Sequence, residues 1–123
     1  MISSILGVSF DCPNANELAD FYRKITGWEK EILDGNEWAG IRTPHGMRLV
    51  FQTVENYVPP VWPWKNDEQQ QMAHIDFKVD NLREAEKLAL RHGAIKSDVQ
   101  YFDTSTVMFD PAGHPFCLSV AEH

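Results

Sequence analysis

Apolar and polar residues alternate along two stretches of the chain, residues 6–11 and residues 73–79. Such alternation is typical of a strand that buries one face. Each stretch leads to an Asn with a Glu three residues later, then to apolar residues at helical spacing and a Gly where a helix can end. The two copies lie about 66 residues apart. They predict two half-domains of one design, with a shared surface where a ligand would bind.

The first copy predicts a βαβββ module over about residues 3–55. Its first strand carries an apolar face that a helix can cover. That helix is expected over residues 14–26, with an apolar stripe formed by Leu18, Phe21, Tyr22 and Ile25. Three further strands are expected at residues 28–33, 38–43 and 48–54.

The second copy predicts the same module over about residues 72–121. Its strand, residues 72–79, precedes a helix with the stripe Leu82, Ala85, Leu88 and Ala89. Later strands are expected at residues 95–99, 104–109 and 115–120. A turn through Asp110-Pro111-Ala112-Gly113 would join the last two.

The linker between the modules, about residues 56–71, is long and rich in proline and aromatic residues. A segment of this length in a compact domain is typically functional. Two interpretations stay open: the linker covers a binding site, or it forms an association surface.

The composition of the chain limits the classes of molecule that it is expected to bind. The net charge of −7 argues against nucleic acid and anionic membranes and favours a neutral or cationic small molecule. Neither a signal peptide nor an apolar run of membrane-spanning length is visible, so we expect a soluble cytoplasmic protein. Cys12 and Cys117 form no CxxC pair and are expected to be free thiols in that compartment.

The paired modules and several local phrases resemble the vicinal oxygen chelate superfamily, which includes glyoxalase I, extradiol dioxygenases, and fosfomycin- and bleomycin-resistance proteins. The phrases are Phe21-Tyr22 through Gly27-Trp28, Leu49-Val50-Phe51-Gln52, Ala73-His74-Ile75-Asp76-Phe77, and Asp110-Pro111-Ala112-Gly113-His114-Pro115-Phe116-Cys117-Leu118. The resemblance covers nearly all 123 residues and is greatest to small glyoxalase-like members. It implies an α+β domain in which two βαβββ modules form a curled, cavity-containing mixed sheet, and a homodimer.

The resemblance also implies four positions for a divalent metal, on the first and last strand of each module. They fall on Gly7, Gln52, His74 and Cys117. Gly7 offers no ligand, Gln52 is a weak oxygen donor, and Cys117 stands where metalloenzymes of the superfamily usually carry a carboxylate. His74 and Gln52 are therefore the candidate metal ligands, but a stable catalytic site generally needs three good ligands. We expect no cofactor, with a divalent metal as the alternative.

His74 lies on the strand face away from the helix. A neutral imidazole there can bind a metal, act as a general base or hydrogen-bond a ligand. A buried histidine satisfied by a carbonyl group is the structural alternative. Cys117 faces the same way by strand alternation. It is expected to be a small buried hydrophobe rather than a nucleophile, which would need a nearby cation or helix N-terminus to lower its pKa.

Four more polar residues are candidates for ligand contact: Ser9, Asp11, Gln52 and Asp76. A carboxylate near His74 would make an acid/base pair, although exposure at a strand end explains Asp11 and Asp76 equally well. Gln52 would hydrogen-bond a ligand or simply line the cavity.

Three tryptophans and a methionine are candidates for an apolar wall around a planar or cationic ligand: Trp38, Trp62, Trp64 and Met108. Alternatively, Trp38 packs in the sheet and the two linker tryptophans are buried at a dimer contact.

These candidate residues support two classes of function. One is a small-molecule-binding protein akin to the bleomycin-resistance members. The other is a metal-dependent lyase, isomerase or dioxygenase that uses His74 and Gln52.

Overall fold

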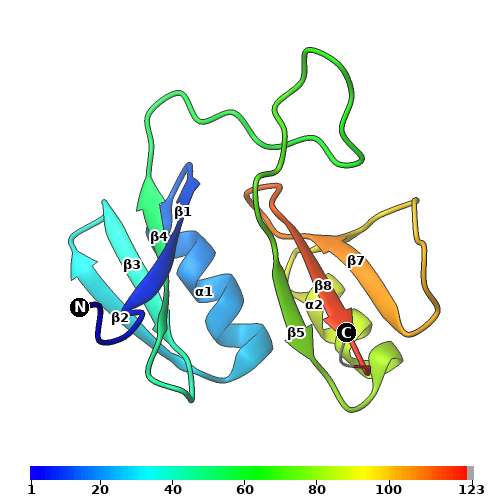
Figure 1. The fold of residues 1–123 in the computed structure, drawn as a ribbon, viewed down its shortest axis with the longest axis horizontal. Coiled ribbons are helices and arrows are strands. Elements are labelled where there is room, and N and C mark those ends of the chain that lie inside the picture. The colour runs from blue at the N-terminus through cyan, green and yellow to red at the C-terminus, as the bar shows by residue number, and fades with distance from the viewer. Residues whose placement is uncertain (122–123) are drawn as a thin grey trace. The chain divides into compact units, whose positions relative to one another are not determined.

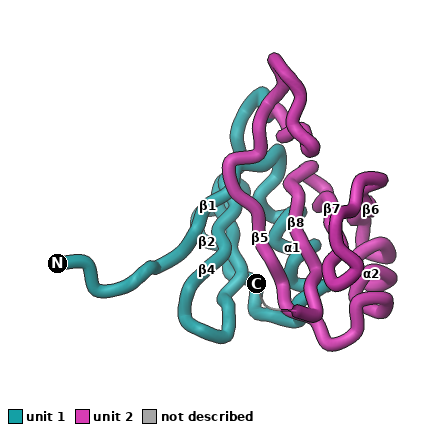
Figure 2. The backbone as a smooth tube through the Cα atoms, turned by 45° about the vertical axis from the view of Figure 1, so that its right-hand side comes forward, with its two compact units in different colours: residues 1–57 teal, residues 58–123 magenta. Residues whose placement is uncertain are grey.

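The structure is a computed structural model that describes residues 1–121. Its contacts divide the chain after Tyr57 into two compact units (Figure 2). Each unit contains one βαβββ module (Figure 1). The linker expected between the modules belongs, from Val58 onward, to the second unit.

The first unit is a four-stranded mixed sheet with one helix. Its elements are β1 (Gly7–Cys12), α1 (Ala15–Thr26), β2 (Glu29–Asp34), β3 (Trp38–Arg42) and β4 (Arg48–Thr53). The strand order is β1-β4-β3-β2, with β1 and β4 parallel and the other pairs antiparallel.

Helix α1 begins and ends where the sequence predicts. The Asn14 side chain accepts a hydrogen bond of 3.0 Å from the Glu17 amide, which caps the first turn. Gly27 ends the helix with φ of 74°, a left-handed conformation that glycine adopts without strain. The buried face of α1 includes Tyr22, whose ring stacks on Phe51 of β4 with centroids 5.2 Å apart. This packing identifies the sheet face that carries Phe51 as the face covered by α1.

The second unit repeats this arrangement. Its elements are β5 (Ile75–Lys78), α2 (Leu82–Arg91), β6 (Ile95–Lys96), β7 (Ser105–Phe109) and β8 (Pro115–Ser119), in the sheet order β5-β8-β7-β6. Asn81 caps α2 by accepting the Glu84 amide at 3.0 Å. The α+β class with two βαβββ modules is therefore confirmed, and neither sheet closes into a barrel.

Strand β6 is shorter than predicted. A strand over residues 95–99 was expected, but pairing with β7 covers Ile95 and Lys96 alone. After Ser97 the chain turns, because the Ser97 hydroxyl accepts the Val99 amide at 3.1 Å. The Gln100 side chain then occupies the place of a strand neighbour, bonding both the amide and the carbonyl of Val107.

The faces of the second sheet follow from strand register. Thr106 donates a hydrogen bond to Glu86 of α2, which marks its side of the sheet as the α2 face. Leu118, which pairs with Thr106, and the Met108–Phe116 pair share that face by alternation. Met108 is fully buried there. Its side chain belongs to the core under α2, so contact of Met108 with a ligand would require a change in that packing and stays a prediction.

The described part of the chain contains no helix that is both long enough and apolar enough to cross a bilayer.

Candidate functional site

His74 and Asp76 lie together on the face of the second sheet that is turned away from α2. His74 directly precedes β5, and the spacing of two residues places both side chains on one side of the strand. The His74 Nε2 atom lies 3.1 Å from Asp76 Oδ1. The two side chains are 40% and 48% exposed, so this pair is open to an incoming ligand.

Cys117 joins this pair from the neighbouring strand. Asp76 of β5 and Cys117 of β8 are direct partners in the parallel ladder. Burial raises the pKa of the Cys117 thiol to about 11, and the negative charge of Asp76 and its hydrogen bond with the thiol add to this effect. The thiol is therefore protonated at neutral pH and is a hydrogen-bond donor rather than a nucleophile.

These three side chains form the polar cluster of the second sheet: His74, Asp76 and Cys117. One potential ligand atom from each lies within 4.8 Å of the others. Imidazole nitrogen, carboxylate oxygen and thiolate sulfur are all zinc ligands in proteins. The cluster can therefore hydrogen-bond a polar ligand group, and its donor atoms also fit a metal ion of the zinc class.

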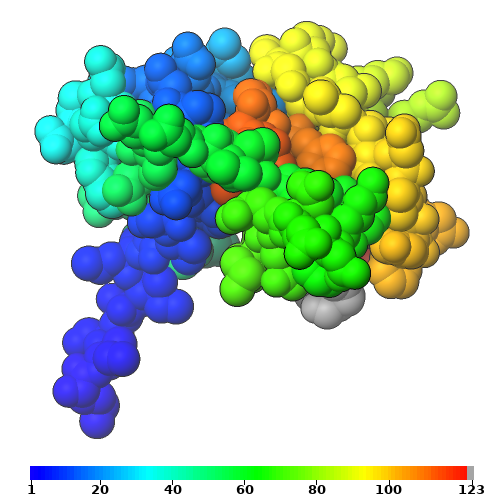
Figure 3. Space-filling view, turned by 90° about the horizontal axis from the view of Figure 1, so that it is seen from above, coloured from blue at the N-terminus to red at the C-terminus, as the bar shows by residue number. Residues whose placement is uncertain are grey.

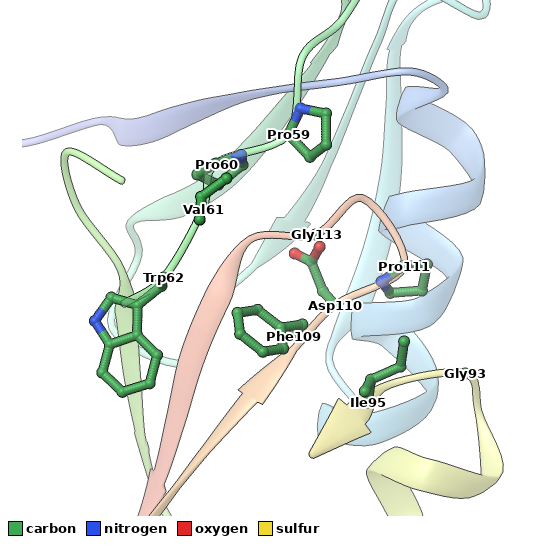
Figure 4. Close-up of a pocket in the computed structure, with 10 residues that line it drawn as sticks. All are labelled: Pro59, Pro60, Val61, Trp62, Gly93, Ile95, Phe109, Asp110, Pro111 and Gly113. Atoms are coloured by element: carbon green, nitrogen blue, oxygen red, sulfur yellow. The ribbon is translucent and has the colours of Figure 1, made fainter. Parts of the chain in front are cut away.

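An apolar pocket of about 550 Å³ lies in the same unit, between the linker segment and the end of the sheet (Figure 4). Figure 3 shows the green linker on the surface beside the yellow and orange segments of this unit. The residues that line the pocket are Pro59, Pro60, Val61, Trp62, Gly93, Ile95, Phe109, Asp110, Pro111 and Gly113. A volume of this size is within the usual range for small-molecule sites.

The aromatic groups of the pocket come from both of its walls. Trp62 and Phe109 contribute rings from the linker and from β7 (Figure 4). Trp62 is also held edge-on against Tyr101, with ring centroids 6.0 Å apart. The Asp110 carboxylate does not project freely, because its Oδ1 atom accepts the amides of Ala112 and His114 at 2.9 and 3.0 Å.

Strand register places the pocket and the polar cluster on one face of the sheet. Phe109 pairs with Ile95, and both line the pocket. Two residues before Phe109, Val107 pairs with Cys117 of the cluster. Two residues along a strand span about 7 Å, so Phe109 and the cluster are neighbours on the face away from α2.

The two linker tryptophans predicted to line the ligand site differ in their surroundings. Trp62 lines the pocket. Trp64 is 50% exposed, lies outside the lining, and its indole N–H donates to the Glu68 carbonyl at 3.2 Å. Sequence reasoning missed Phe109 and Ile95 as lining residues. The available signal for Phe109 was that it ends a predicted strand directly before the Asp-Pro-Ala-Gly turn. Ile95 lies in a predicted strand but far from that turn in the sequence.

The predicted ligand-contact residues of the first unit lie in a row on one face of its sheet. Gln52 of β4 is the register partner of both Asp11 and Trp38, so the three residues lie side by side on the face away from α1. Ser9 lies on the same face, two residues before Asp11. Ligand contact by this row stays a prediction, as does the metal set of Gln52 and His74, which joins residues of different units.

Gly7 is closely packed against the neighbouring strand. A Cβ added there would lie 2.7 Å from the Arg48 carbonyl oxygen, which is closer than real Cβ contacts. Any ligating side chain at this position would therefore displace the β1 backbone. The resemblance assigned a metal position to Gly7, and the backbone packing explains why a glycine fits there.

Comparisons with known proteins agree with this architecture. The profile of a family described as "Glyoxalase-like domain" matches residues 7–119. No curated protein sequence matches the chain.

Several solved structures share the fold. A mutant of the fosfomycin resistance protein FosX from Listeria monocytogenes, in complex with Mn(II), is 15% identical with a TM-score of 0.72, over 99% of this chain and 93% of its own. A glyoxalase/bleomycin resistance protein/dioxygenase family enzyme from Burkholderia phytofirmans is 14% identical with a TM-score of 0.70, over 94% and 97% of the two chains. A lactoylglutathione lyase from Agrobacterium tumefaciens is 13% identical with a TM-score of 0.63, over 96% and 93%. At these identities the likeness concerns the fold. Because the family profile spans most of the chain and the solved structures share its architecture, this protein belongs to the glyoxalase-like family of the vicinal oxygen chelate superfamily.

Proposed function

We propose that this protein binds a small, planar, neutral or cationic molecule on the face of its second sheet that is turned away from α2. The observation that carries the proposal is the apolar pocket beside the polar cluster. The Trp62 and Phe109 rings supply flat apolar surface, and the cluster supplies hydrogen-bonding groups for one end of the ligand.

Charge supports the neutral or cationic class. The chain carries a net charge of −7, and the half-exposed Asp76 carboxylate lies within the cluster. Both disfavour an anionic ligand. A cation held over an indole face gains about 0.5 to 2 kcal/mol, which makes Trp62 the natural contact for a positively charged group.

The test is a ligand-observed NMR screen of neutral, cationic and anionic aromatic compounds against the full chain. Trp62→Ala should weaken the binding of hits about tenfold or more, because it removes one wall of the pocket. Trp64→Ala is the matched control, since Trp64 is a linker tryptophan outside the lining, and it should leave binding unchanged. Hits that bind Trp62→Ala as tightly as the unmodified protein would refute the pocket as the site.

A second candidate function, a metal-dependent lyase, isomerase or dioxygenase, is favoured by the donor set of His74, Asp76 and Cys117. A divalent ion held there would polarise an oxygen atom of the substrate as a Lewis acid. His74 and Asp76 would hold the ion at the exposed edge of the face, and the pocket would orient the substrate. Similar chains include a lactoylglutathione lyase and a fosfomycin resistance protein complexed with Mn(II). Turnover of such substrates by metal-loaded protein, abolished in His74→Ala, would favour this candidate.

We also propose a cytoplasmic homodimer. Both cysteines are free, which suits a reducing compartment. Tyr101 and Phe102 are 67% and 70% exposed side by side, and large adjacent apolar groups favour association. Analytical ultracentrifugation should give a dimer that dissociates in a Tyr101→Ser, Phe102→Ser variant. A monomer at all concentrations would exclude the dimer.

A further inference from the structure

We propose that Arg42 and Arg48 form a binding site for the oxyanion group of a small molecule, a phosphate or a carboxylate, on the face of the first sheet that is turned away from α1. The site lies wholly within the first unit. The proposal therefore goes beyond ligand binding by the second unit and does not depend on it.

Strand register places the two arginines side by side. Arg42 of β3 and Arg48 of β4 are direct partners in the antiparallel ladder. Phe51 lies on the α1 face, because its ring stacks on Tyr22, so Arg48, three residues before it, points to the opposite face. Like charges directly across two strands repel one another and destabilise a sheet. The arginine pair therefore needs negative charge beside it.

Glu31 supplies one part of that negative charge. Its two carboxylate oxygens accept one hydrogen bond each, from Arg42 Nε at 2.6 Å and from Arg48 Nε at 2.8 Å. Within residues 1–121, no other hydrogen bond, ion pair or ring contact engages either guanidinium group. Because Glu31 binds both arginines through Nε, the terminal N–H groups of each keep their donors. Two positive charges and one negative charge also leave one positive charge uncompensated.

The remaining donors suit an oxyanion. The paired N–H groups of a guanidinium match two oxygen atoms of a carboxylate or phosphate, and such charge-assisted bonds are stronger than neutral ones. The Arg42 and Arg48 side chains are 44% and 33% exposed, so a small ion can reach them. On its other side Arg48 pairs with Gly7, where an added Cβ would come within 3.3 Å of Arg48 Cβ. The glycine therefore leaves room beside the Arg48 side chain.

Other charges near the pair determine how tightly an anion binds. Glu29 of β2 is the register partner of Arg42 and is exposed, so its carboxylate competes with an incoming anion. The net charge of −7 belongs mostly to more distant groups, and salt screens charges beyond about 8 Å at physiological ionic strength. Binding should therefore be weak but selective, and removal of the Glu29 charge should tighten it.

The experiment is an NMR titration of the full chain with inorganic phosphate or acetate, at constant ionic strength in a chloride background, observed at the arginine Nε–H signals. We expect saturable shifts at Arg42 and Arg48 and none at Arg23, an exposed arginine of the same unit. Saturation by only one of the two anions would support the site and identify the preferred group. Shifts that do not saturate, or that are equally large at Arg23, would overturn the proposal.

Variants separate the site from a purely structural ion network. Arg48→Lys and Arg42→Lys each keep the positive charge but remove the paired donors, and each should weaken binding about fivefold or more. Arg23→Lys is the matched control and should leave binding unchanged. Glu29→Gln should tighten binding about twofold or more, because it removes the competing carboxylate. Urea denaturation of each variant establishes that the fold is retained. Unchanged affinity in both folded lysine variants at positions 42 and 48 would overturn the proposal.

Discussion

Asp76 and Cys117 lie opposite one another on the parallel strands β5 and β8, and a hydrogen bond links the Cys117 thiol to the Asp76 carboxylate. Burial and this contact together raise the pKa of the Cys117 thiol and keep the proton on sulfur. The thiol therefore does not act as a nucleophile at neutral pH. A carboxylate beside His74 was expected from the sequence as an acid/base partner, whereas its contact with the cysteine was not.

The reactivity of Cys117 should follow from this contact. Burial and Asp76 raise the pKa of the thiol to about 11, so iodoacetamide should modify it slowly at pH 7.5 and progressively faster as the pH approaches 11. Asp76→Asn removes the neighbouring charge, lowers the pKa and should accelerate alkylation several-fold at pH 7.5. Mass spectrometry of the peptide containing Cys117 measures the rate, and fully buried Cys12 is the internal control. Rapid alkylation of the unmodified protein at neutral pH would contradict this reading.

Gly7 should not tolerate a side chain. Gly7→Ala brings a Cβ to within 2.7 Å of the Arg48 carbonyl oxygen, and relief of that contact must shift β1 away from β4. We expect a loss of roughly 1 to 3 kcal/mol in the free energy of unfolding, measured by urea denaturation. Ser9→Ala, at an exposed position of the same strand, should change stability by less than about 0.5 kcal/mol. Equal stability of the two variants would show that β1 adapts freely.

Glu31 should stabilise the first unit in a pH-dependent way. Burial raises the pKa of its carboxyl, but hydrogen bonds from Arg42 and Arg48, at 2.6 and 2.8 Å, outweigh that effect and hold the pKa below its usual value. A carboxyl with a lowered folded-state pKa stabilises the fold above its unfolded pKa, and this contribution is lost as the pH falls through the folded value.

The test compares Glu31→Gln with Glu29→Gln, a change at an exposed glutamate of the same strand. In urea denaturation at pH 7, Glu31→Gln should unfold at a lower midpoint than the unmodified protein, and Glu29→Gln should not. The difference should shrink as the pH is lowered from 7 through the depressed folded-state pKa of Glu31, where the carboxyl of the unmodified protein becomes protonated. A difference that stays constant as the pH is lowered would mean that charge does not carry the effect.

The sequence predicted the elements better than it predicted their faces. Asn14 and Asn81 were recognised as helix caps because capping depends on local spacing, and the structure confirms both. The face of Met108 could not be read in the same way. In β7 the α2 face carries Thr106 and Met108, while the opposite face carries Val107 and Phe109, so hydrophobicity does not distinguish the two sides.

The pocket depends on long-range contacts that no local pattern records. The linker was predicted to be functional from its length and composition, but the contact of Trp62 with Tyr101 joins residues far apart in the sequence. Likewise, strand propensity extended β6 to residue 99, whereas the Ser97 and Gln100 side chains replace the backbone ladder after Ser97. Whether side chains take the place of backbone strand pairing in this way depends on tertiary structure.

Gln100 should therefore matter for the stability of the second sheet. Its side-chain oxygen accepts the Val107 amide at 2.8 Å, and its side-chain nitrogen donates to the Val107 and Ser97 carbonyls, each at 2.9 Å. Gln100→Ala leaves the Val107 amide without its acceptor and should cost roughly 1 to 3 kcal/mol in urea denaturation. Gln100→Glu keeps the acceptor but loses the donor, so it should also be destabilised. Gln69→Ala, at an exposed linker position, should be neutral. If Gln100→Ala were as stable as the Gln69→Ala control, water would be replacing the side chain at Val107, and the turn after Ser97 would need another explanation.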